Sequence, residues 1–243
     1  MMNLRWIALA AVAALLTACG TTADRPASGA GTGPELREEA YQYLAGEEGQ
    51  VYRLAPDDSE IRILAYRAGA LAEQGHNHVV TVPAFRGRAW LPEEGLAEAR
   101  FDLVAELADL EVDPPEARAE LGHTFGKPFT AEQRQGTRAN MLGDGLLQAD
   151  RHPRLGLRSV EVRGALPRPV VKMAITLHGV TREQWVPLAM ETEGDRLVAE
   201  GRFLIRHGDF GLEPFTALGG LLAVQERIMV EFRVEGRPVA GDG

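Results

Sequence analysis

Residues 175–181 read Ile-Thr-Leu-His-Gly-Val-Thr, and this stretch decides the fold. Apolar residues recur at every second position on both sides of it, namely Val171, Met173, Ile175 and Leu177 before it and Val186, Leu188 and Met190 after it. Such alternation is typical of strands with one buried face, and a glycine between two such runs indicates a tight hairpin. The stretch therefore predicts two antiparallel strands joined by a turn at Gly179.

The same alternation recurs along the chain. In residues 98–105, Phe101 and Leu103 face one side while Arg100 and Asp102 face the other. Comparable runs occupy residues 51–54, 59–66, 84–91, 155–163, 197–205 and 228–234. Together they predict about eight strands, each apolar on one face and charged on the other.

We interpret this pattern as mainly β, with an eight-stranded antiparallel β-barrel of the lipocalin-like kind. Closure removes unpaired sheet edges, and an eight-stranded interior either fills with side chains or holds one small ligand. A two-sheet sandwich shows the same alternation, so the pattern alone leaves both architectures open. A helical insertion is predicted near one end, because Thr130 can cap a helix over residues 131–142 that ends at Gly143. Such a helix could cover the mouth of the barrel.

The N-terminus has the features of a processing signal. Arg5 precedes an apolar run over residues 6–16, which is too short to span a bilayer as a helix. Leu16-Thr17-Ala18-Cys19 then resembles the lipobox of bacterial lipoproteins. This resemblance implies that residues 1–18 are a signal peptide and that Cys19 becomes the acylated N-terminus; a chance cysteine after an ordinary signal is the alternative. Gly20 would favour the outer membrane, facing the periplasm, in a Gram-negative cell envelope.

The remaining chain divides by composition. Residues 19–33 are small and almost uncharged, which predicts a flexible tether, and residues 34–48 predict a short helical lead-in. The barrel domain follows over residues 49–237, with a C-terminal tail at 238–243. The chain carries 26 basic against 35 acidic residues, and this excess of acid argues against nucleic acid as a partner. It also argues against adsorption to anionic lipid, so we expect the acyl chains to hold the protein at a membrane.

Four segments in order resemble the YceI family of polyisoprenoid-binding, lipid-binding proteins. They are Tyr52-x-Leu54-x-Pro56-x-x-Ser59, Leu147-x-Ala149-x-x-His152-Pro153-x-Leu155-x-Leu157-x-Ser159, Leu177-His178-Gly179-Val180-Thr181 and Arg206-x-x-Asp209-Phe210-Gly211-Leu212. The resemblance covers about residues 51–234. It implies an extended lipocalin-like barrel that holds a long isoprenoid lipid.

An apolar ligand also has a physical basis, since enclosed carbon needs no polar contact to be stabilised. The inward-facing residues that we expect to line its site are Ile63, Phe101, Leu103, Met173, Ile175, Phe203, Ile205 and Phe232. The alternative is that these side chains pack against one another as a solid core. The expected partners are an apolar lipid and, through the anchor, a membrane; a homodimer is compatible with the sequence.

Gly75-His76-Asn77-His78 departs from the usual family pattern. On a strand, His76 and His78 point to the same side and could share a transition metal, which makes a metal-binding protein or metalloenzyme the second hypothesis. A third ligand would have to come from His123, His152 or His178. The alternative is a polar cluster at the barrel mouth, bonded to backbone or to Arg138 and Asn140.

Other catalytic motifs are missing from the sequence. It contains neither a Gly-x-Ser-x-Gly nucleophile elbow nor a glycine-rich phosphate loop, and Cys19 is the only cysteine. Arg134 and Arg138 share a helix face and could meet a polar head group, although such pairs more often face solvent. We therefore expect a protein that is not an enzyme and has no cofactor beyond a bound lipid.

Overall fold

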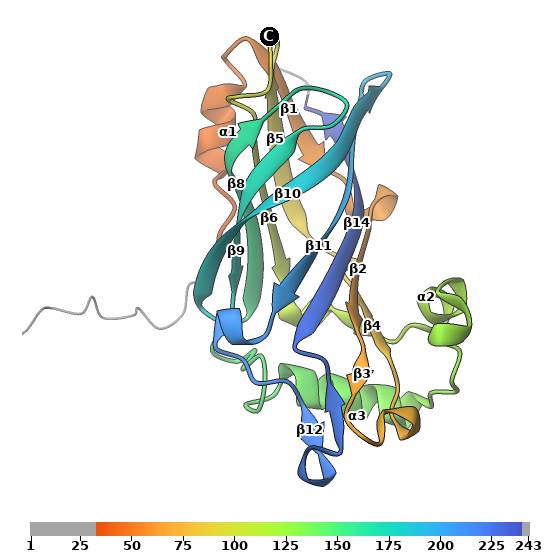
Figure 1. The fold of residues 1–243 in the computed structure, drawn as a ribbon. Helices are drawn as coiled ribbons and strands as arrows, with labels where there is room; N and C mark the ends of the chain where they lie inside the picture. The colour runs from red at the N-terminus through yellow and green to blue at the C-terminus, as the bar shows by residue number, and fades with distance from the viewer. Residues whose placement is uncertain (1–32, 240–243) are drawn as a thin grey trace, which may run out of the picture. The chain divides into compact units, whose positions relative to one another are not determined.

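The computed structural model describes residues 33–239, in which eight strands close an antiparallel barrel (Figure 1). In order around the barrel they are β1 (Gly49–Leu54), β5 (Arg86–Pro92), β6 (Arg100–Glu106), β8 (Arg154–Arg163), β9 (Val170–Leu177), β10 (Val180–Glu193), β11 (Arg196–Arg206) and β14 (Arg227–Pro238). The ring closes where β1 pairs with β14, with Tyr52 opposite Pro238 and Leu54 opposite Gly236. The predicted barrel is confirmed, and this closing pair excludes the open sandwich.

Strand β14 is long enough to hold two neighbours on one edge. Its C-terminal end pairs with β1, and its N-terminal half pairs with β2 (Glu60–Ala65). Beyond β2 the sheet continues through β4 (His78–Thr81) and β7 (Glu111–Val112). This extension lengthens the wall of the barrel at one end, which we call the mouth end.

A second, three-stranded sheet was not predicted. It consists of β3 (Arg67–Ala68), β12 (Thr216–Ala217) and β13 (Leu222–Val224). The connections also contain short 3₁₀ helices at Pro56–Asp58, Ala72–Gln74, Leu107–Asp109, Gly122–Thr124, Gly208–Phe210 and Leu218–Gly220. Strands of two or three residues are too short for the alternation of side chains to show in a sequence.

The hairpin at residues 175–181 is confirmed. Strand β9 ends at Leu177 and β10 begins at Val180, so two residues form the turn. Both have left-handed backbones, with φ of 52° at His178 and 71° at Gly179. Left-handed conformations at both central positions give a turn whose twist matches that of the flanking strands.

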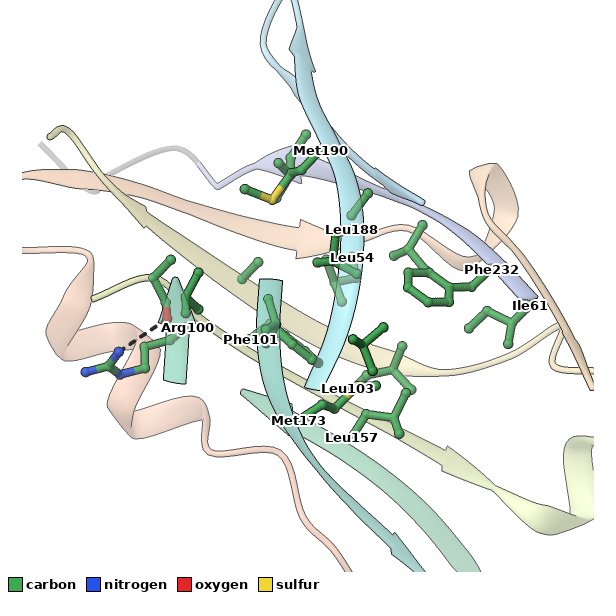
Figure 2. A pocket seen from close by; sticks show the side chains of 18 of the residues that line it. Leu54, Ile61, Arg100, Phe101, Leu103, Leu157, Met173, Leu188, Met190 and Phe232 are labelled. Atoms are coloured by element: carbon green, nitrogen blue, oxygen red, sulfur yellow. Dashed lines mark hydrogen bonds between the residues drawn. The ribbon is translucent and has the colours of Figure 1, made fainter. Parts of the chain in front are cut away.

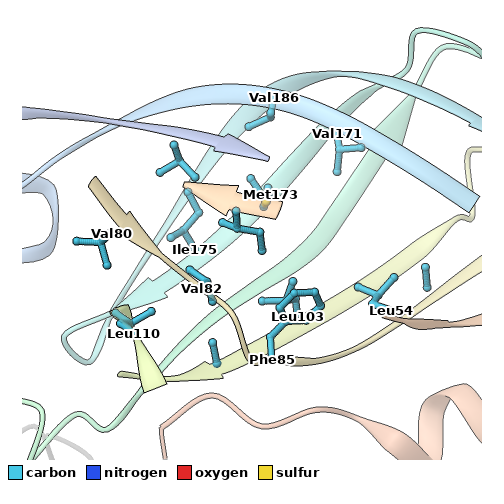
Figure 3. Packing of buried hydrophobic residues seen from close by; sticks show 14 of the residues in the cluster. Leu54, Val80, Val82, Phe85, Leu103, Leu110, Val171, Met173, Ile175 and Val186 are labelled. Carbon is cyan, nitrogen blue, oxygen red and sulfur yellow. The ribbon is translucent and has the colours of Figure 1, made fainter. Parts of the chain in front are cut away.

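Alternation along these strands fills the interior with apolar side chains (Figure 3). On β9, Val171, Met173 and Ile175 are buried, while the intervening residues are only partly buried. The same cluster takes residues from every strand of the ring. The core of the domain is therefore the inside of the barrel.

Helix α1 (Glu38–Leu44) lies in the predicted lead-in and buries Tyr41 against Val51 and Trp90. The lead-in also covers Asp102, which faces outward from β6 yet is only 1% exposed. Arg37 donates to Asp102 through Nε at 2.8 Å and Nη2 at 3.0 Å, and Arg158 Nε donates at 2.7 Å. The hydrogen bond to Asp102 raises the pKa of Arg37 above its ordinary value, although burial partly opposes it. Alternation correctly predicts the side on which Asp102 lies but not that another segment covers it.

Helix α2 (Pro115–Glu120) lies beside β4, and helix α3 (Ala131–Leu142) crosses the mouth end of the barrel (Figure 1). Helix α3 has the predicted bounds because of a capping box: Gln133 N donates to Thr130 Oγ1, and Thr130 N donates to Gln133 Oε1. Near its end, Met141 and Leu142 pack against the core. Helix α3 therefore lies over the mouth end, where a cover was predicted.

The predicted signal peptide, Cys19 and nearly all of the predicted tether lie outside residues 33–239. Within that range, none of the helices has the length and apolarity needed to cross a membrane.

The turn at Gly179 provides a stability test. A Cβ added there would lie 2.8 Å from Cε1 of His152, whereas one added at Gly194, which has a similar φ of 65°, meets no atom within 4 Å. Gly194→Ala should therefore cost only the backbone strain of roughly 1–2 kcal/mol. Gly179→Ala should cost measurably more, because the imidazole ring must also move. Urea unfolding of both variants measures the difference, and equal losses would contradict the predicted packing of the turn.

Candidate ligand-binding cavities

A cavity of about 120 Å³ lies inside the barrel (Figure 2). We call it the barrel cavity. Of the 21 residues that line it, 20 have apolar side chains, and the exception is Arg100. The guanidinium of Arg100 donates to the carbonyls of Glu98 and Ala99, so its charge is paired with backbone. The walls of the cavity therefore offer almost no polar group to a ligand.

The structure places the eight predicted lining residues in three groups. The barrel cavity is lined by Phe101, Leu103, Met173, Phe203 and Phe232. Ile63 and Ile205 line a second cavity at the mouth end. Ile175 is buried in the core and is not part of either wall.

Sequence reasoning missed several residues of the barrel cavity that lie on the same inward face. They include Leu54, Ile61, Leu157, Val186, Leu188, Met190, Leu197 and Val230. The alternation that identified the inward face applies equally to these residues. It does not distinguish a side chain that borders a void from one that is packed on all sides.

The volume of the barrel cavity limits what it holds in this conformation. An engineered apolar cavity of roughly 150 Å³ binds benzene. A cavity of about 120 Å³ therefore accommodates a few carbon atoms. A longer chain has to extend out of it along the barrel axis or displace the flexible side chains that line it, such as Met173 and Met190.

The second cavity, of about 490 Å³, lies between the mouth end of the barrel and α3. We call it the mouth cavity. It follows the barrel cavity along the axis, because Ile63, Ile205 and Ile228 line it two positions beyond Ile61, Phe203 and Val230 on the same strands. Its wall is mixed: apolar residues such as Ile63 and Leu107 are joined by polar ones, namely His78, Thr137, Asn140, Asp144, Arg206 and His207. The two cavities therefore form an apolar compartment followed by a partly polar one.

Within residues 33–239, no third metal ligand completes a site with His76 and His78. His78 begins β4 and its Nδ1 lies 2.7 Å from Asp113 Oδ2, whereas His76 precedes the strand and its Nε2 lies 3.2 Å from the carbonyl of Pro128. Their ring centroids are 6.5 Å apart. Among residues 33–239, no group of three His, Cys, Asp or Glu side chains is arranged to hold a metal ion. The geometry favours the alternative of a polar cluster at the mouth.

The other candidate histidines lie elsewhere, and His123 is exposed in the 3₁₀ helix Gly122–Thr124. His152 and His178 pack edge to face against each other, with ring centroids 4.8 Å apart. The ring of His178 also lies against the carbonyl of Phe210, with Nδ1 3.1 Å from the oxygen. These two rings support the β9–β10 turn.

The two helix arginines bond to backbone in this structure. Arg134 Nη1 donates to the carbonyl of Phe129 at 2.9 Å, and Arg138 Nη2 donates to the carbonyl of Ala108 at 2.5 Å. These contacts attach α3 to the loops at either side of it. Neither arginine lines the mouth cavity.

The architecture defines a class of protein, the closed antiparallel barrels with an apolar interior. The family model of the YceI-like domain matches residues 52–236, and the chain belongs to this family. The chain is similar in structure to BcnA of Burkholderia cenocepacia, with a TM-score of 0.56 and 12% identity over 75% of this chain and 98% of that one. It is also similar to the YCEI protein of Campylobacter jejuni, with a TM-score of 0.49 and 12% identity over 66% of this chain and 85% of that one. No curated protein matches the sequence significantly.

The histidine pair behind the turn predicts a dependence of stability on pH. Burial and the neighbouring His178 and Arg151 lower the pKa of His152 below its ordinary value. The unfolded chain therefore binds more protons than the folded one as pH falls below about 6.5, and stability should fall with it. The loss of unfolding free energy between pH 7.5 and pH 5.5 should be smaller in His152→Gln than in the wild type. Identical losses in urea unfolding would contradict this assignment.

Proposed function

We propose that this chain binds a long apolar lipid of the isoprenoid type inside its barrel, as a carrier or sequestering protein and not as an enzyme. The observation that carries the proposal is the barrel cavity, 20 of whose 21 lining residues are apolar. Such a wall selects ligands by apolar surface alone. Membership of the YceI-like family and the absence of a three-ligand metal group among residues 33–239 support this reading over a metalloprotein.

The energetics suit a hydrocarbon chain. Each buried methylene contributes roughly 0.8 kcal/mol, so a few enclosed isoprene units give useful affinity without polar contacts. Because the two cavities follow one another along the axis, a chain that fills the barrel cavity can continue into the mouth cavity. A linear, flexible ligand fits this arrangement better than a compact one.

The proposal includes a place in the cell. We propose that the chain is a lipoprotein of the bacterial cell envelope, anchored through acylated Cys19, at the outer membrane and facing the periplasm if the cell is Gram-negative. The support is the apolar run over residues 6–16 followed by Leu16-Thr17-Ala18-Cys19. The barrel would then hold its ligand next to the membrane from which that ligand comes.

Extraction of the purified, undenatured protein with organic solvent, followed by mass spectrometry, tests the binding function directly. We expect an isoprenoid lipid in the extract, or stoichiometric uptake of an added polyprenol. A protein that is empty in several preparations and takes up no added isoprenoid contradicts the proposal.

Filling the barrel cavity should abolish uptake. Ala199 lines the cavity on β11, and Ala199→Phe adds a benzene-sized ring to a space of about 120 Å³. We expect at least tenfold weaker binding of a radiolabelled polyprenol, measured by gel filtration, because the ring occupies the volume the ligand needs.

Ala189→Phe is the matched control for this variant. Ala189 lies on the adjacent strand β10 of the same hairpin but is exposed on the outer face. This variant should bind as the wild type does, and thermal melting should show both variants folded. Unchanged binding by a folded Ala199→Phe protein would place the ligand elsewhere.

The anchor has its own test. Metabolic labelling with radioactive palmitate should label the wild-type chain expressed in a bacterium, and Cys19→Ser should abolish the label because the acceptor sulfur is lost. Label that persists in Cys19→Ser, or an unlabelled wild type, would contradict the lipoprotein assignment.

A further inference from the structure

His78 lies on the inward face of the wall at the mouth end. The register of β2 and β4 pairs Ile63 with Val80 and Ala65 with His78, and all four residues line the mouth cavity. The intervening Val79 is fully buried on the opposite face. The imidazole of His78 is therefore part of the cavity wall by the same alternation that builds the barrel.

A buried carboxylate fixes the orientation of this ring. Asp113 is 0% exposed, and its Oδ2 lies 2.7 Å from Nδ1 of His78. Its Oδ1 accepts hydrogen bonds from Val79 N at 3.1 Å and from Arg118 Nη1 at 2.5 Å. An ionised carboxylate only accepts hydrogen bonds, so Nδ1 of His78 carries the proton and donates it. The bond made by one ring nitrogen determines the state of the other.

Nε2 is consequently an acceptor in the neutral ring. No residue in the range 33–239 makes a hydrogen bond to Nε2 of His78. Because Nδ1 is bound to Asp113, the Nε2 edge points away from the buried carboxylate, and the residue itself lines the mouth cavity. The rings of Phe129 and His76, with centroids 5.4 Å and 6.5 Å from that of His78, restrict its movement. His78 thus gives the mouth cavity an acceptor whose direction is fixed by Asp113.

We propose that the mouth cavity holds the polar end of the ligand and that His78 accepts a hydrogen bond from a hydroxyl group on it. The ligand class is then an isoprenoid alcohol, with its tail in the barrel cavity. This inference rests on the proposed function and adds the chemistry of the head group. A site that hydrogen-bonds a hydroxyl binds an analogue without one less tightly, because the acceptor loses its water when the ligand covers it and gains no partner in return.

Asp113 and Arg118 also have a structural role, and it is separable from that of His78. Arg118 donates to Asp113 and to the carbonyls of Asn77, Phe125 and Lys127, and so attaches α2 and the following loop to β4. These bonds do not involve the imidazole of His78. Substituting His78 removes one partner of the buried Asp113 carboxylate but keeps the bonds of Arg118, so α2 and the following loop stay attached while the acceptor is tested.

The test compares a polyprenol with its methyl ether, which has the same tail and oxygen but no hydroxyl hydrogen. The full-length wild type should bind the alcohol about tenfold more tightly, which corresponds to roughly 1.4 kcal/mol for one hydrogen bond. His78→Phe should bind both ligands with equal affinity. His76→Phe is the matched control and should keep the preference, because Nε2 of His76 already faces the carbonyl of Pro128.

A measurement on the wild type alone covers the case in which His78→Phe does not fold. The ¹⁵N resonance of Nε2 of His78 should shift when the alcohol binds and remain in place when the ether binds. Equal binding of alcohol and ether by the wild type overturns the inference while leaving the proposed function intact, as does a preference that survives in His78→Phe. Failure of both ligands to bind would instead contradict the proposed function.

Discussion

Closure of the sheet between β1 and β14 is the constraint on which the rest of the structure depends. Once Tyr52 and Leu54 pair with the end of β14, every strand of the ring has two neighbours, and the inward positions of all eight strands converge on one space. The apolar residues at alternate positions therefore point into that space, while the charged residues between them face outward. The apolar interior is a consequence of closure combined with a period of two.

The mouth end differs from the rest because β14 exchanges one neighbour for another along its length. Where β2 replaces β1, the wall continues into β4, and the first residue of β4 is His78. Asp113, which directly follows β7, binds β4 through the backbone of Val79 and through the imidazole of His78. Apart from Arg100, the polar residues that line the two cavities therefore lie at this end, which α3 crosses (Figure 1).

The sequence predicts the parts of this architecture that have a local signal. Alternation of apolar residues predicts the strands and their inward faces. The His178-Gly179 turn predicts the hairpin, and Thr130 with Gln133 predicts where α3 begins. Five of the expected lining residues border the barrel cavity for the same reason. Features that depend on distant contacts could not be predicted: the burial of Asp102 by Arg37, the two-residue strand β7, and the pairing of His78 with Asp113 are all set by tertiary packing.

We infer that the inside of the barrel is a container for an apolar chain. Intermolecular NOEs between a polyprenol with a ¹³C-labelled tail and the methyl groups of the protein test it most directly. We expect NOEs to the inward methyls of Leu103, Met173 and Val230, and none to the exposed methyls of Val160 and Leu204. NOEs confined to the exposed methyls, with the inward resonances unchanged, would contradict it.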